Sequence, residues 1–133
     1  MDGRIFHLKE LLLKNLQHKW TVEEMSQIVE LSVPHFQKLF RAEMGMAPLT
    51  YLRDLRLVKA RELLEKKFYR VKQIRVEVGI RNDSHFTRDF KKKYGLTPTE
   101  YRKHFWKKSK LKGLMTRNDR IRQKNHFSRR NNC

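Results

Sequence analysis

The sequence predicts an all-α fold of seven helices, arranged as two helix-turn-helix subdomains joined by a long linking helix. Apolar residues recur at helical spacing along most of residues 1–106, and no segment reads as a convincing strand. The sequence also matches itself when it is shifted by 50 residues, so one structural unit of about 40 residues occurs twice. The matching pairs are Ser32 and Asn82, His35 and His85, Phe36 and Phe86, Lys38 and Arg88, Phe40 and Phe90, Arg41 and Lys91, Gly45 and Gly95, Pro48 and Pro98, and Tyr51 and Tyr101.

Upstream of these pairs the shift falls to 49 residues, which aligns Met25 with Ile74 and Val29 with Val78. One extra residue in a turn of the second copy explains the change. Two copies are too few for a solenoid, which needs at least about three repeats. They predict two similar modules that lie side by side.

The first helix-turn-helix is expected over about residues 21–45, after an N-terminal helix. Thr21 and Ser32 are suitable N-caps for its two helices, Pro34 fits the first turn of the second, and Gly45 ends that helix in a left-handed C-cap. The residues expected to face the core are Ile5, Leu8, Leu11, Leu12 and Leu16 in the N-terminal helix, Val22, Met25, Ile28 and Val29 in the next, and Phe36, Leu39 and Phe40 in the third.

The linking helix is expected over about residues 50–66, which contain no glycine or proline. About 17 helical residues would span about 25 Å. The residues assigned to its apolar face are Leu52, Leu55, Val58, Leu63 and Leu64.

The second helix-turn-helix is expected over about residues 71–95. Gly79 lies where the chain must turn, Asn82 caps the second helix, and Gly95 ends it. Pro98 begins a last short helix. The residues of this copy expected along its helices are Val71, Ile74, Val78, His85, Phe86, Phe90 and Tyr94.

Composition restricts the class of protein. The chain has 133 residues, of which 38% are hydrophobic, enough for one domain with a modest core. No apolar run of 18 residues is present, which excludes a membrane-spanning helix, and the first ten residues lack the order of a secretion signal. The single cysteine, Cys133, excludes an intrachain disulfide and a cysteine zinc cluster. We therefore expect a reduced, cytoplasmic protein with no membrane partner.

The net charge of +18 indicates a polyanionic partner. Residues 1–106 hold 22 basic and 13 acidic side chains, and residues 107–133 hold 10 basic and 1 acidic. The excess on the folded part favours nucleic acid over anionic lipid. We expect residues 107–133 to form a basic, flexible tail. Its charge could serve solubility or attract phosphates, and the sequence does not decide between the two roles.

The two second helices carry side chains suited to reading DNA. In a helix-turn-helix this helix lies in the major groove, where each base pair shows a distinct donor and acceptor pattern. Lys38 and Arg88 could donate to guanine, Gln37 could pair with adenine, and Ser84 and Thr87 suit smaller contacts. Because the two copies differ at these positions, we expect one chain to read an asymmetric site.

Other polar residues are expected at the DNA backbone, where contacts position the protein without reading sequence. The residues assigned to the backbone are Ser32, His35, Arg41, Asn82, His85, Lys91 and Lys92. A metal role for His35 and His85 is disfavoured, because no second histidine or cysteine lies at helical spacing from either. No cofactor is expected.

These residues resemble the DNA-binding domain of the AraC/XylS family of bacterial transcription regulators, over about residues 5–103. The matching residues of the second copy are Gly79-Ile80, Ser84-His85-Phe86, Arg88, Phe90-Lys91, Gly95, Thr97-Pro98 and Tyr101-Arg102. Those of the first copy and the link are Ser32-Val33-Pro34-His35-Phe36, Leu39-Phe40, Gly45-Met46, Pro48, Tyr51-Leu52-Arg53, Leu55-Arg56-Leu57 and Ala60-Arg61-Glu62-Leu63-Leu64.

The resemblance implies a domain over residues 1–106, a promoter site on double-stranded DNA, and activation by contact with RNA polymerase on the bacterial nucleoid. The base-reading positions that it implies are Pro34, Gln37 and Lys38 in the first recognition helix and Asp83, Ser84, Thr87 and Arg88 in the second. Because the module begins near residue 5, we expect no sensing domain before it within these 133 residues. The chain is then either a stand-alone regulator or the C-terminal piece of a longer one with an N-terminal sensing or dimerisation domain.

Four residues depart from the family pattern. Glu30 replaces a glycine in the first turn, which costs about 1 kcal/mol if that turn is left-handed. Arg75 replaces a small residue, and its long stem is expected to extend outward. Ile80 replaces a phenylalanine, which predicts a looser core. Asp83 is expected to support the helix start, with a cytosine contact as the alternative.

The sequence also bears on two other classes of function. An enzyme is not expected, because the sequence has no phosphate-binding glycine loop, no paired carboxylates in a shared setting and no nucleophile beside a base. A non-specific nucleic-acid protein, associated with the nucleoid or with RNA, is the alternative that the charge and the tail allow.

Overall fold

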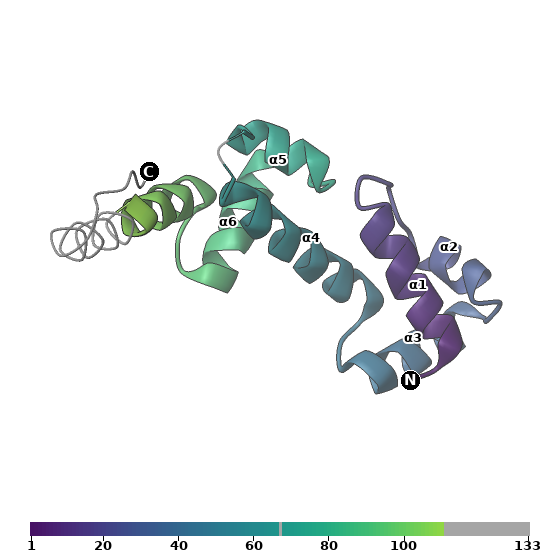
Figure 1. The fold of residues 1–133 in the computed structure, drawn as a ribbon. Coiled ribbons are helices and arrows are strands. Elements are labelled where there is room, and N and C mark those ends of the chain that lie inside the picture. The colour runs from purple at the N-terminus through teal and green to yellow at the C-terminus, as the bar shows by residue number, and fades with distance from the viewer. Residues whose placement is uncertain (67, 111–133) are drawn as a thin grey trace, which may run out of the picture.

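The computed structural model describes residues 1–66 and 68–110, and within them the chain forms seven helices and no strand (Figure 1). The predicted all-α fold class is confirmed. The helices are α1 (Gly3–Lys14), α2 (Val22–Ile28), α3 (Val33–Met44), α4 (Pro48–Leu64), α5 (Val71–Glu77), α6 (Asp83–Tyr94) and a seventh over residues 98–110.

The internal repeat corresponds to two equal helix pairs. Helices α2 and α5 have 7 residues each, and α3 and α6 have 12 each. The connection over residues 78–82 is one residue longer than that over residues 29–32. The change of shift from 50 to 49 is therefore confirmed as one extra residue in the second turn.

Local signals set the helix ends as predicted. The side chains of Thr21, Ser32 and Asn82 accept hydrogen bonds from backbone N–H groups in the first turns of α2, α3 and α6. Gly45 and Gly95 follow α3 and α6 in the left-handed conformation, with φ of +76° and +83°. Residues next to α3 and α6 therefore cap each of these 12-residue helices at both ends.

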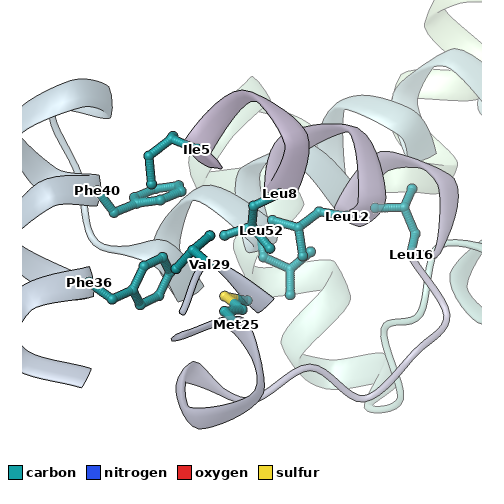
Figure 2. Close-up of a cluster of buried hydrophobic side chains, with 9 residues drawn as sticks. All are labelled: Ile5, Leu8, Leu12, Leu16, Met25, Val29, Phe36, Phe40 and Leu52. Atoms are coloured by element: carbon teal, nitrogen blue, oxygen red, sulfur yellow. The ribbon is translucent and has the colours of Figure 1, made fainter. Parts of the chain in front are cut away.

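The two helix pairs have separate hydrophobic cores. The first core joins α1, α2, α3 and the start of α4 (Figure 2), and the second joins α4, α5 and α6. The buried residues of the first are Ile5, Leu8, Leu12, Leu16, Met25, Val29, Phe36, Phe40 and Leu52, and those of the second are Leu57, Ala60, Leu63, Leu64, Ile74, Val78, Phe86 and Phe90. Figure 1 shows α4 running between the two groups of helices, so it contributes to both cores.

The aromatic residues of the repeat are core residues, as predicted. Phe40 packs edge-on against Tyr51 with 5.5 Å between ring centroids, and Phe90 packs against Tyr101 in the same way at 5.8 Å. The four phenylalanines of α3 and α6 are at most 1% exposed. These rings are therefore not available to stack on unpaired bases.

The linking helix has the predicted 17 residues, but it begins and ends two residues earlier than expected. Pro48 is its first residue, where the missing N–H removes no helical hydrogen bond. The buried face was also partly wrong. Leu57 and Ala60 are buried, whereas Leu55 and Val58 are half-buried, because one helix must turn separate faces to two cores.

Arg75 does not extend outward, so that expectation was wrong. Its side chain is 13% exposed and turns back over the end of α5, where Nη1 donates to the carbonyl oxygens of Ile80 at 2.9 Å and Arg81 at 2.7 Å. The guanidinium thus supplies donors to the turn that leads into α6. Ile80 is half-buried against the second core.

The seventh helix continues through residue 110, beyond the predicted domain end at residue 106. Most of the predicted basic tail, residues 111–133, lies outside the described residues. Among the residues that the structure describes, no helix is long and apolar enough to cross a membrane.

Candidate nucleic-acid interface

Helix α3 presents a polar and basic surface opposite its buried face. Phe36 and Phe40 lie in the first core, which directs the residues between and beside them to solvent. The predicted contact residues that are exposed here are Ser32, Pro34, His35, Gln37, Lys38 and Arg41. All the side chains predicted to contact DNA from the first unit are therefore accessible.

Helix α6 repeats this arrangement in the second unit. The exposed predicted residues are Asn82, Asp83, Ser84, His85, Arg88, Lys91 and Lys92, whereas Thr87 is half-buried. The guanidinium of Arg88 lies beside its neighbour, with Nε 3.2 Å from Asp89 Oδ1. Arg88 is 66% exposed, so this ion pair can exchange for a base contact at little cost.

Some of the predicted contact residues already have structural roles. The Ser32 hydroxyl oxygen accepts from the backbone N–H of His35 at 3.3 Å, and Asn82 Oδ1 accepts from that of His85 at 2.9 Å. Asp83 lies in the first turn of α6, 3.7 Å from Arg75 Nε, where a carboxylate favours the positive end of the helix. Their contacts to DNA stay predictions.

The predicted residues form two surfaces, one on each unit. Helices α3 and α4 pack together in the first unit, as do α5 and α6 in the second. Across the described parts of the chain, no hydrogen bond or ion pair joins α3 to α6. The relative position of the two surfaces is therefore set by α4 and by the contacts around it.

The main contact between the units was not found from the sequence. Arg56 of α4 donates to the carbonyl oxygen of Leu16 from Nε at 3.0 Å and from Nη2 at 2.8 Å, and Nη2 also donates to the His18 carbonyl at 2.9 Å. Gln17 adds a bond of 3.3 Å from Nε2 to Glu77 Oε2. The loop after α1 is thereby fixed to α4 and to the end of α5.

Gly79 completes this junction, because it lies against the same carbonyl group. A Cβ at this position would overlap the Leu16 carbonyl oxygen and would lie 3.1 Å from Arg56 Nε. Its φ of +84° also favours glycine. Arg56 itself is desolvated, and burial followed by the nearby charge of Arg81 lowers the pKa of its guanidinium.

The C-terminal end of α4 is held by the seventh helix. The Tyr101 hydroxyl donates to Glu65 Oε2 at 2.6 Å, and Arg102 donates to the carbonyl oxygens of Leu64 at 3.0 Å and Lys66 at 3.1 Å. Burial, with the hydrogen bond to Glu65 as the second cause, raises the pKa of Tyr101 to about 12. Arginine side chains bonded to backbone carbonyls therefore fix α4 at two places, Arg56 at its middle and Arg102 at its C-terminal end.

Comparison with known proteins identifies the same kind of domain. A family model described as a helix-turn-helix domain matches residues 25–104. The chain is 37% identical over 102 residues to the RCS-specific HTH-type transcriptional activator RclR of Escherichia coli, which covers 77% of this chain and 36% of RclR. It is 34% identical over 102 residues to an HTH-type transcriptional regulator of Haemophilus influenzae, covering 77% of this chain and 34% of that protein. The chain thus spans about a third of the length of these relatives.

Solved structures share the fold. The DNA-binding domain of the transcriptional factor AdpA, in complex with a target DNA, superposes with a TM-score of 0.74 at 26% identity, covering 78% of this chain and 94% of that one. A transcriptional regulator with an AraC-type DNA-binding domain, from Chromobacterium violaceum, superposes with a TM-score of 0.70 at 24% identity, covering 77% and 91%. The two-unit arrangement is therefore the arrangement of this domain type.

Proposed function

Since the chain belongs to the AraC/XylS family of helix-turn-helix regulators, we propose that it regulates transcription by sequence-specific binding to double-stranded DNA. The observation that carries the proposal is the repeated pair α2–α3 and α5–α6, in which each second helix buries two phenylalanines and exposes polar and basic side chains. Exposed side chains on such a helix are those that reach base edges in the major groove.

The dimensions of α4 suit binding in successive major grooves. Its 17 residues span about 25 Å at about 1.5 Å per residue, and one turn of DNA rises about 34 Å. The widths of the two recognition helices add to the length of α4, so both helices can enter successive major grooves from one side of the duplex. Because Gln37-Lys38 and Thr87-Arg88 differ, the two helices would read different bases and the site would be asymmetric.

Further parts of the proposal concern partners and location. RclR carries the name of a transcriptional activator, which supports activation of promoters here through contact with RNA polymerase. The site of action would be the bacterial cytoplasm, on the nucleoid. A stand-alone regulator and the C-terminal piece of a longer one would use the same two DNA-reading surfaces.

The test is selection of bound duplexes from a random pool, followed by affinity measurements on the selected and a scrambled duplex. Replacing Arg88 with alanine should cost about 1–3 kcal/mol on the selected duplex and relax preference at one base pair. Lys92→Ala should weaken both duplexes about equally, because a phosphate contact carries no sequence information. If Arg88→Ala changes neither affinity nor preference, α6 is not a base-reading helix.

The high net charge favours a second candidate, non-specific nucleic-acid binding. Such binding would weaken alike on every sequence as salt rises, whereas a sequence-specific regulator keeps its preferred duplex. A salt titration on the selected and scrambled duplexes therefore separates the two functions.

A further inference from the structure

A cationic cleft of about 520 Å³ lies between the two helix-turn-helix units, and most of its lining lies outside the residues predicted to contact DNA. The loop before α2, the middle of α4 and the start of α6 form its walls. The basic residues that line it are Lys19, Arg53, Arg56, Arg81 and Arg88. Among the described residues of the lining, Asp89 is the one acidic side chain, and it is already paired with Arg88.

Three of these cations are not used by the fold. Lys19, Arg53 and Arg81 are exposed, and within residues 1–66 and 68–110 none of them forms an ion pair. Arg56, by contrast, is committed to the Leu16 and His18 carbonyls. The like charges of Arg81 and Arg56 act on each other, since Arg81 contributes, after burial, to the lowered pKa of Arg56. The cleft therefore concentrates positive charge, with Asp89 as the one acidic side chain against five basic ones among its described lining residues.

The start of α6 adds to the attraction for an anion. Arg81, Asn82 and His85 all line the cleft, and α6 begins at Asp83. Backbone N–H groups at the N-terminus of a 12-residue helix carry a partial positive charge, which favours phosphate groups. Side-chain cations and the helix end thus act on the same space, although the Asp83 carboxylate in the first turn of α6 offsets part of the helix charge.

We propose that this cleft binds phosphodiester groups of the DNA strand that passes between the two major grooves. The inference rests on the proposed function, because helices in successive major grooves leave the intervening minor groove and its two backbones facing the junction. Arg88 lines the cleft and also belongs to the base-reading surface of α6. When Arg88 contacts a base in the major groove, the adjoining phosphate backbone would therefore lie near Lys19, Arg53 and Arg81, which line the same cleft.

The test compares three cleft variants, Lys19→Gln, Arg53→Gln and Arg81→Gln, with Lys14→Gln as a matched control. Lys14 is an exposed cation that lines a different cavity, beside Lys59 and Glu77. Dissociation constants are measured by fluorescence anisotropy on selected and scrambled duplexes over a series of salt concentrations. Each cleft variant should weaken both duplexes to the same extent, by roughly tenfold, and reduce the salt slope by about one. Lys14→Gln should leave the slope unchanged.

Two results would overturn the proposal. One is a wild-type salt slope in all three cleft variants, and the other is an equal loss of slope in Lys14→Gln. If the cleft variants bind DNA like wild type but fail to activate transcription with RNA polymerase, the cleft binds an acidic protein surface instead. Circular dichroism melting checks that each variant is folded. The salt slope is also measured on the scrambled duplex. Phosphate binding by the cleft can therefore be tested even if the protein shows no sequence-specific recognition.

Discussion

Replacing Glu30 with glycine should stabilise the protein, although the change removes a side chain. Glu30 is the one residue other than glycine with a positive φ in the described part of the chain, at +59°. It occupies the turn between α2 and α3, at the position equivalent to Gly79 in the second unit. Its side chain is exposed, so the backbone conformation and not packing dominates the effect of the substitution.

The expected gain follows from two opposing terms. A residue with a Cβ loses about 1–2 kcal/mol in the left-handed conformation, and glycine is free of this cost. Glycine also destabilises the folded state by about 0.5–1 kcal/mol, because it gives the unfolded chain more conformational freedom. The net stabilisation is then about 0.5–1 kcal/mol, which corresponds to a rise in Tm of about 2–4 °C for a domain of this size.

Urea and thermal unfolding followed by circular dichroism measure the effect. Glu30→Ala is the control, because it removes the carboxylate and keeps the Cβ. We expect Glu30→Ala to lie within about 0.5 kcal/mol of wild type. A Glu30→Gly protein no more stable than Glu30→Ala would refute the reasoning from backbone strain.

Two further predictions concern the junction and the end of α4. Gly79→Ala should destabilise the protein by roughly 2–4 kcal/mol, because the Cβ adds left-handed strain and overlaps the Leu16 carbonyl; an unchanged urea midpoint would contradict this. The folded state raises the pKa of Tyr101 from 10.0 to about 12, so it binds that proton more tightly than the unfolded state does. The stability from this group is complete below pH 10 and is lost as the pH rises to about 12. Unfolding at a series of pH values should therefore show a shallower alkaline decline in Tyr101→Phe, and parallel profiles would count against the raised pKa.

Features that depend on neighbouring residues were predictable from the sequence. The caps at Ser32 and Asn82 and the left-handed glycines at positions 45 and 95 act within a few residues, so their residue types identify them. The exposed faces of α3 and α6 follow from helical periodicity once Phe36, Phe40, Phe86 and Phe90 are assigned to the core. This is why the predicted contact residues are exposed as expected, apart from the half-buried Thr87, while their contacts to DNA stay predictions.

Features that join distant segments were not predictable. The sequence does not show that the guanidinium of Arg56 meets a carbonyl 40 residues earlier, because a backbone acceptor has no sequence signature. A backbone acceptor also concealed the role of Arg75, although its acceptors, the Ile80 and Arg81 carbonyls, lie only five and six residues away. Leu57 and Ala60 were missed because a single apolar stripe was assumed, whereas α4 serves two cores. The cationic cleft could not be predicted from the sequence either, because it forms only where the loop before α2, the middle of α4 and the start of α6 meet.

The way α4 is built explains how the protein could select the spacing of its binding site. Leu52 belongs to the first core and Leu57 to the second, so bending the helix between them would disturb both. Arg56, at the middle of the helix, fixes the first unit at the Leu16 carbonyl, and Arg102 fixes the C-terminal end of the helix at the Leu64 carbonyl. These contacts favour a single orientation of α3 relative to α6 in the folded chain. A duplex whose two contact regions are displaced by half a turn could engage only one recognition helix, because the other would face a phosphate backbone instead of a groove.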